Sequence, residues 1–290
     1  MPTNRAELLV TPEELAGELD RDDQVIVDCR FNLKKPGAGR QAWESGHIPG
    51  AFYADLDKDL ASPVTADSGR HPLPDPEAFG ALLGSWGAGP ETRVIAYDNA
   101  GGGVAARLWW LLRWVGHEKA LLLDGGLPAW EEAGLPIQTE QPKLSAGHYP
   151  VKPGSMPVIS VTEVQAALGE DALCLLDARA PKRFAGIHEP IDPVAGHVPG
   201  ALNLPYDACL DDAGRFRGAG ELQSMLRERL GAGQPGAVAC MCGSGVTACH
   251  IVFAMELAGL VPDQIEIPAL YVGSWSEWIR SEERPRESAA

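Results

Sequence analysis

The chain has 290 residues, of which 45% are hydrophobic, so it is long enough to form two ordinary domains with buried cores. Its formal net charge of -16 leaves little basic surface for phosphate groups, which disfavours binding to nucleic acid or to anionic membranes. The N-terminal stretch MPTNRAELLVTPEEL is charged throughout, and the most apolar run, LWWLLRWVG, is interrupted by Arg113, so we expect neither a signal peptide nor a membrane span. Six cysteines are too few for a disulfide scaffold, and we therefore expect a cytoplasmic protein with reduced thiols.

The two halves of the chain carry the same motifs in the same order, which indicates a duplicated domain. Each half has a capping box for a helix, an apolar strand that ends in Asp-x-Arg, a Gly-His-x-Pro-Gly-Ala stretch and a late glycine–tryptophan pair. The matched segments are TPEE and SVTE, VIVDCR and CLLDAR, SGHIPGA and AGHVPGA, and DGGLPAW and VGSWSEW. Residues 138–157 are rich in Pro, Gly and Ser, so we predict domains at residues 1–137 and 158–290 joined by this linker.

Short apolar strands alternate with helices in each copy. In chain order, the predicted strands cover residues 24–28, 93–98 and 120–124 in the first copy and residues 173–177, 237–241 and 264–268 in the second. Helices with a period of about 3.6 residues are predicted over residues 104–116 and 246–260. This alternation predicts an α/β fold in which each copy is a parallel sheet covered by helices on both faces.

The stretch CMCGSGVTACH, residues 240–250, concentrates the side chains that could carry chemistry. A predicted strand precedes it and a predicted helix follows, so Cys242 to Thr247 form the turn between them. Backbone N–H groups and a positive helix end surround such a turn, and this arrangement suits an anion. The corresponding turn of the first copy, DNAGGGV, has Asp98 where Cys242 stands.

Three other kinds of site fit this turn less well. Zinc is disfavoured because the cysteines and His250 lack the usual paired spacing with a second, remote pair. The segment GSGVTA satisfies a dinucleotide fingerprint with Asp263 further on, but it lies in the second half of its domain and the other copy does not keep the pattern. A cysteine phosphatase needs an arginine at the end of the loop to hold the phosphoryl oxygens, and Ala248 stands there.

A single activated thiolate is the fourth interpretation, and Cys242 fits it. A cysteine at a helix N-terminus, inside a ring of N–H donors, ionises more readily than a free thiol. Cys240, on the preceding strand, and Cys249, on the apolar helix, are expected to be small buried hydrophobic residues.

Together these residues resemble the rhodanese-type sulfurtransferases, and more narrowly the two-domain enzymes that use 3-mercaptopyruvate or thiosulfate. The resemblance rests on the loop CGSGVT, the Gly-His-x-Pro-Gly-Ala stretch in both halves and the closing GSWSEW. It implies tandem rhodanese-like domains, of which the first is catalytically silent and the second carries the catalytic Cys242. It also implies a ping-pong reaction without cofactor or metal, in which Cys242 takes sulfur from a small-molecule donor as a persulfide. The sulfur then passes to cyanide, a small thiol or a thioredoxin-like protein.

Further site residues follow from the same resemblance. Arg183 in KRFAG is expected to bind the donor's anionic group, while Ile191 occupies the place of a second arginine found in the mercaptopyruvate enzymes. Ser244, Asp57 and His71 match positions proposed in that family as a Ser–His–Asp relay, and simple hydrogen bonding between the domains is the alternative.

The remaining loop residues bear on the choice of donor. The loop members expected to hold the sulfur anion through their N–H groups are Gly243, Ser244, Gly245, Val246 and Thr247. Thiosulfate-preferring relatives typically place Arg and Lys where Gly243 and Ser244 stand, so the neutral loop favours 3-mercaptopyruvate. A thiosulfate-preferring rhodanese is the alternative, and a non-catalytic anion-binding or dinucleotide-binding protein is a more distant one.

Overall fold

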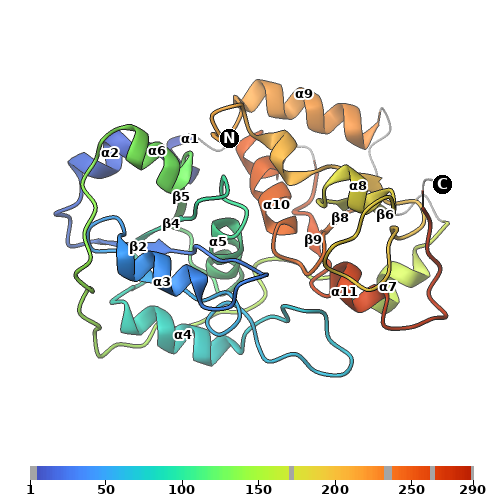
Figure 1. The fold of residues 1–290 in the computed structure, drawn as a ribbon, viewed down its shortest axis with the longest axis horizontal. Coiled ribbons are helices and arrows are strands. Elements are labelled where there is room, and N and C mark those ends of the chain that lie inside the picture. Colours follow the sequence, from blue (N-terminus) through green and yellow to red (C-terminus); the bar gives the residue numbers. More distant parts are fainter. Residues whose placement is uncertain (1–4, 170–172, 232–236, 262–264, 289–290) are drawn as a thin grey trace.

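A computed structural model describes residues 5–169, 173–231, 237–261 and 265–288. Figure 1 shows two α/β units side by side, the first drawn in blue to green and the second mainly in yellow to red. Each unit is built on a sheet whose strand pairs are all parallel, in the order β1-β5-β4-β2-β3 in the first and β7-β6-β8-β9 in the second. The predicted fold class, a pair of α/β units with parallel sheets, is confirmed.

The elements of the two units follow one another in a similar order. The strands of the first unit are β1 (Leu9–Val10), β2 (Gln24–Asp28), β3 (Phe52–Tyr53), β4 (Arg93–Tyr97) and β5 (Ala120–Leu123). Its helices are α1 (Arg5–Leu8), α2 (Pro12–Gly17), α3 (Ala38–Ser45), α4 (Pro76–Ser85), α5 (Ala105–Trp114) and α6 (Gly126–Glu132). The strands of the second unit are β6 (Leu173–Asp177), β7 (Leu202–Asn203), β8 (Ala237–Met241) and β9 (Ala269–Leu270). Its helices are α7 (Val161–Ala166), α8 (Pro181–Phe184), the 3-10 helix η1 (Tyr206–Cys209), α9 (Ala219–Leu230), α10 (Ala248–Leu257) and α11 (Ser274–Trp278).

The central strands and the central helices lie where the apolar pattern predicts them, but the last strand does not. Residues 264–268 were expected to form it, whereas β9 is Ala269–Leu270 and Ile265 to Pro268 form no strand. Ile265 and Ile267 are half-buried against the core, with the exposed Glu266 between them. Their alternation therefore reflects packing from a loop, not pairing with β8. Gln264 lies outside the described residues.

The linker segment lies against the first unit. Residues 138–157 form no helix, and their one strand-like contact is the bridge between His47 and Gln138. The Tyr149 N–H donates to the carbonyl of Gly80 at 3.0 Å, and the Lys152 N–H donates to that of Val115 at 2.9 Å. These contacts attach the segment to α4 and to the end of α5.

Helices α5 and α10 meet at the centre of the molecule (Figure 1). Ala105 to Leu112 are all buried, which is typical of a helix covered on every side. The Trp109 ring meets Phe253 of α10 edge-on, with the ring centroids 5.0 Å apart. Because both helices begin at the junction of the units, the two turns that precede them also lie there. Among the residues that the structure describes, no helix is long and apolar enough to cross a membrane.

Candidate active site

The loop from Cys242 to Thr247 connects the end of β8 to the start of α10, as predicted. The Ser244 N–H donates to Cys242 Sγ at 3.5 Å, so the sulfur already has a backbone donor of the loop. Gly245 has φ 76°, and a Cβ at this position would lie 2.5 Å from the carbonyl oxygen of Val272. A side chain is therefore excluded on two grounds, and the glycine lets the loop turn closely around the sulfur.

The GSWSEW segment supports the loop from outside. Ser274 Oγ accepts the Cys242 N–H at 3.1 Å and donates to the carbonyl of Tyr271 at 2.8 Å. The N–H groups of Trp275 and Ser276 donate to the carbonyls of Cys242 and Gly243 at 3.1 and 2.9 Å. These two carbonyls are thereby bound by α11. Ser274 has φ 52° and is the one non-glycine residue of the described ranges with positive φ, so the support is built at a cost in backbone strain.

The predicted relay residues lie together across the junction of the units. His71 Nδ1 lies 2.7 Å from Ser244 Oγ, and His71 Nε2 lies 3.1 Å from Asp57 Oδ1. Asp57 and His71 come from loops that follow β3 and precede α4, whereas Ser244 comes from the loop before α10. Only the fold brings these side chains to one place.

The protonation state of His71 sets the direction of this chain of hydrogen bonds. Burial, together with Arg107 and Arg70 nearby, lowers the pKa of His71 to about 3, so the ring is neutral at physiological pH. Asp57 is half exposed, and burial and Asp55 raise its pKa. An ionised carboxylate only accepts hydrogen bonds, so His71 Nε2–H donates to Asp57. Nδ1 is then the acceptor, and the Ser244 hydroxyl donates to it.

Two guanidinium groups converge on Gly243, the residue after the cysteine. A Cβ on Gly243 would lie 3.1 Å from Arg70 Nη2 and 3.3 Å from Arg183 Nη2. Arg183, on α8, was predicted from sequence. Arg70 was missed, although it immediately precedes His71 in the recognised segment RHPLP. Ile191 is partly exposed and contributes no charge here.

Arg107 is a second cation that the sequence analysis missed. It is fully buried on α5, and its guanidinium donates to the carbonyls of Gly245 and His71, each at 3.2 Å. No carboxylate of the described residues forms an ion pair with it. Arg107 therefore ties the cysteine loop to the segment that carries His71.

The other thiols near the loop are poorly suited to react. Burial raises the pKa of Cys240 well above its ordinary value, and it raises the pKa of Cys249 to about 12 in spite of Arg107. The Cys249 thiol donates to the carbonyl of Gly245 at 3.3 Å. Both side chains are buried, as predicted, and remain neutral thiols.

Within the described ranges, no three His, Cys, Asp or Glu side chains are placed to hold a metal ion.

The corresponding turn of the first unit is filled by its own carboxylate. Asp98 is 1% exposed, and its Oδ1 accepts the N–H groups of Ala100 and Gly102 at 2.7 and 2.9 Å. Its Oδ2 accepts those of Val104 and Ala105 at 2.7 and 2.9 Å. The turn thus binds an anion, as the pattern predicted for turns of this type, but that anion is part of the chain.

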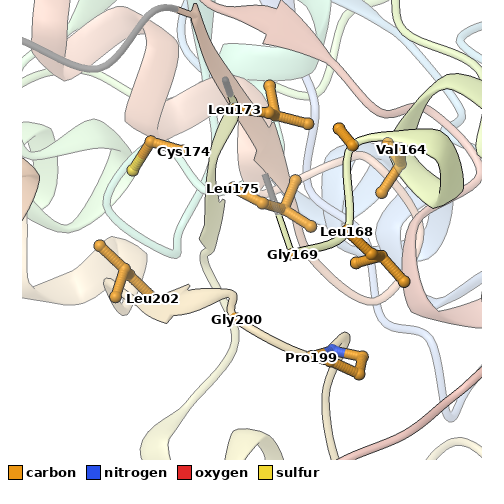
Figure 2. A pocket seen from close by; sticks show the side chains of 10 residues that line it. Val164, Leu168, Gly169, Leu173, Cys174, Leu175, Pro199, Gly200 and Leu202 are labelled. Atoms are coloured by element: carbon orange, nitrogen blue, oxygen red, sulfur yellow. The ribbon is translucent and has the colours of Figure 1, made fainter. Parts of the chain in front are cut away.

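A separate pocket of about 360 Å³ lies at the opposite end of the second sheet. It is lined by Leu173 and Leu175 at the start of β6, whereas Cys242 follows the far end of β8, which pairs with β6 in parallel. Figure 2 shows the Cys174 sulfur pointing to the other side of the strand from these two leucines. Among the residues that the structure describes, no charged side chain lines this pocket, and it lies away from the site described above.

Known proteins resemble this chain over nearly its whole length. A family model described as rhodanese-like domain matches residues 11–133 and again residues 160–281. A probable 3-mercaptopyruvate sulfurtransferase of Pseudomonas aeruginosa is 44% identical over 279 residues, which cover 96% of each chain. A putative thiosulfate sulfurtransferase of Mycobacterium tuberculosis is 39% identical over 285 residues, or 97% of each chain. The structure of 3-mercaptopyruvate sulfurtransferase from Leishmania major superposes with a TM-score of 0.79 at 30% identity, covering 96% of this chain and 75% of that one.

Proposed function

The chain belongs to the rhodanese family and is a sulfurtransferase, and we propose that it takes sulfur from 3-mercaptopyruvate through a persulfide on Cys242. The observation that carries this proposal is the position of Cys242. It is the one cysteine that lies in the strand-to-helix loop, with a backbone N–H donor on its sulfur. Loop N–H groups that surround an anionic sulfur stabilise it before and after the transfer.

In the first half-reaction, the Cys242 thiolate attacks the sulfur of 3-mercaptopyruvate. A bond forms between the two sulfurs and the carbon–sulfur bond of the donor breaks. The electron pair of that bond leaves with the three-carbon fragment as an enolate, which takes a proton and becomes pyruvate. In the second half-reaction, an acceptor thiolate attacks the outer sulfur and the Cys242 thiolate is regenerated, which is covalent catalysis in two steps.

Ser244 positions the donor in this scheme. Its hydroxyl hydrogen is directed to His71, so the lone pairs of Oγ are free to accept a hydrogen bond from the donor's S–H group. The low pKa of His71 favours a positioning role for the relay, because the neutral ring does not store a proton in the resting enzyme. Thiosulfate has no S–H group and gains nothing from this contact.

The charges around the loop also favour a singly charged donor. The two arginines next to Gly243 are balanced by two carboxylates, since Arg183 pairs with Glu189 at 2.9 Å and both arginines pair with Asp192. A carboxylate of charge minus one fits this balanced site better than the dianion thiosulfate. Slower transfer from thiosulfate is expected as a side activity.

The remaining parts of the proposal concern the first unit, the acceptor and the compartment. We assign no turnover to the first unit, because Asp98 replaces the cysteine and fills its turn. A small thiol or a thioredoxin-like protein is the proposed acceptor. The six cysteines are all free, which is consistent with a reducing cytoplasm.

Mass spectrometry of the protein after incubation with donor tests the persulfide. Wild type and the Cys240→Ala and Cys249→Ala variants should each gain one sulfur atom on Cys242 with 3-mercaptopyruvate, and more slowly with thiosulfate. Cys242→Ser should gain none and should lose turnover. Loss of the persulfide in folded Cys240→Ala, or a tenfold preference of wild type for thiosulfate, would contradict the proposal.

A further inference from the structure

We propose that Arg107 of the first unit is a positioning residue for sulfur transfer, which supplies a buried positive charge to the sulfur anion of Cys242 and holds the Gly245 carbonyl away from it. This inference rests on the proposed function of the loop. Arg107 is fully buried and its guanidinium faces backbone carbonyls, so it acts through the loop and takes no part in holding the donor.

The charge of Arg107 has no opposite charge beside it in the described parts of the chain. No carboxylate there pairs with it, and its Nε is buried without a hydrogen-bond partner. Its terminal nitrogens donate to the backbone carbonyls of Gly245, His71, Pro72 and Leu60 at 3.2–3.5 Å. A buried charge is costly unless an opposite charge lies close to it, so an anion that forms nearby during the reaction is stabilised.

The sulfur of Cys242 is the group that can become this anion. Burial lowers the pKa of Arg107, and the sulfurs of Cys249 and Cys242 lie close enough to oppose this change when they are charged. Cys249 does not ionise near neutral pH, because burial raises its pKa to about 12. The Cys242 thiolate, and the persulfide that forms from it, are therefore the negative charges that balance Arg107.

Arg107 also fixes the direction of the peptide group between Gly245 and Val246. Its Nη1 donates to the Gly245 carbonyl at 3.2 Å. The C=O and N–H of a planar trans peptide point in opposite directions, so the Val246 N–H is turned away from Arg107. In the first unit, the Gly102 N–H at the matching position donates to Asp98 at 2.9 Å. By the same geometry, the Val246 N–H is directed at the anion of the cysteine loop.

The turn of the first unit receives a reciprocal contact, but from a neutral side chain. His250 Nε2, on α10, lies 3.0 Å from the carbonyl oxygen of Gly101, which follows Asp98 at the same spacing as Gly245 follows Cys242. Burial lowers the pKa of His250 to about 4, so this ring is uncharged at neutral pH. The turn with a built-in carboxylate thus meets a neutral group, whereas the loop whose anion forms during the reaction meets a permanent cation.

Alkylation of Cys242 by iodoacetamide tests the charge without any sulfur donor, because the reagent is uncharged and reacts with the thiolate. Arg107→Gln keeps a hydrogen-bond donor without the charge, and Arg107→Lys keeps the charge. Arg107→Met is a second neutral variant, since an apolar side chain of similar size often replaces a buried charge without loss of stability. His250→Asn is the matched control, because His250 makes the reciprocal contact across the same junction.

The alkylation rate is measured as a function of pH, with mass spectrometry to confirm the modified residue. All variants keep the other charged or titratable side chains around the loop, which are Arg70, His71, Arg183, Asp192, Cys240 and Cys249. Differences in the pH profile between the variants therefore report on position 107.

At neutral pH, Cys242 should react at least about tenfold more slowly in Arg107→Gln and Arg107→Met than in wild type, and the midpoint of the pH profile should move to higher pH. Arg107→Lys should recover most of the rate, and His250→Asn should react like wild type. Rapid-quench mass spectrometry of persulfide loading from 3-mercaptopyruvate should show a lower kcat in the two neutral variants, with KM within about twofold of wild type.

Two results would overturn the inference about Arg107. An unchanged pH profile in either neutral variant, once its circular dichroism shows that it is folded, means that the charge does not act on the sulfur. An equal loss of rate in Arg107→Lys, with the midpoint unmoved, means that Arg107 only supports the loop. A wild type that is alkylated as expected but gains no sulfur from 3-mercaptopyruvate refutes the proposed function instead, and the alkylation series still decides the role of Arg107.

Discussion

Replacing Asp98 by asparagine should destabilise the protein strongly while leaving the chemistry of Cys242 in place. The buried carboxylate accepts four N–H groups, and the amide keeps an oxygen for only two of them. Its NH2 group would instead face two N–H donors, which then have no acceptor. Hydrogen bonds to charged groups contribute about 1.5–3 kcal/mol each, so losing two should lower the free energy of unfolding by about 3 kcal/mol or more.

Urea denaturation followed by tryptophan fluorescence measures this loss. Asp75→Asn is the matched control, because Asp75 caps α4 through a single bond to the Ala78 N–H at 2.9 Å and asparagine caps helices equally well. We expect the control to stay within about 0.5 kcal/mol of wild type. If Asp98→Asn also stays within that range, the carboxylate does not hold the turn and the reasoning fails. Donor loading, measured as above, should change little in both variants.

Two further predictions concern acid stability and the serine of the loop. Burial lowers the pKa of His71 to about 3 and that of His250 to about 4, whereas a histidine in the unfolded chain has a pKa of about 6.5. Between these values, only the unfolded chain binds a proton on each of the two side chains. The contribution of the two histidines to the free energy of unfolding should therefore be constant above pH 6.5. It should fall as the pH drops toward 4, by at most about 1.4 kcal/mol per pH unit for each histidine. Urea denaturation at pH 7 and pH 5 should show a smaller difference in His250→Asn than in wild type, and an unchanged difference would be evidence against this origin. Ser244→Ala should lower kcat/KM at least about tenfold for 3-mercaptopyruvate but not for thiosulfate, and equal losses for the two donors would exclude the proposed contact with the S–H group.

The sequence predicts those parts of the fold that produce their own local signal. Strands β2, β4, β5, β6 and β8 are runs of buried apolar residues, and α5 and α10 have enough turns to show their period. Strands β1, β3, β7 and β9 have two residues each, too few for any pattern, and their pairing depends on the neighbouring strand. The misplaced strand at residues 264–268 shows the same limit, because alternating burial also occurs in a loop packed on a core.

The site divides in a similar way. Cys242 and its loop are recognisable because one short segment contains the strand end, the glycines and the start of the helix. Arg70 could not be recognised in the sequence, because its position beside the loop depends on its contact with Asp192, which lies 122 positions away. Nor does the sequence reveal that Arg107, on an apolar helix, reaches the carbonyl of Gly245 from the other unit. The sequence therefore predicts one cation for the donor, Arg183, whereas the folded protein places Arg70 and Arg107 at the loop as well.

The division of the site between the two halves of the chain has a consequence during protein synthesis. The ribosome makes Asp57, Arg70 and His71 long before it makes Cys242, and domains generally fold in the order in which they emerge. The first half can therefore be folded, with its docking face formed, before the cysteine leaves the exit tunnel. A nascent chain that ends before residue 242 contains Arg70 and His71 but not Cys242. Cys242 is therefore made only after the part of the first unit that covers it can already have folded.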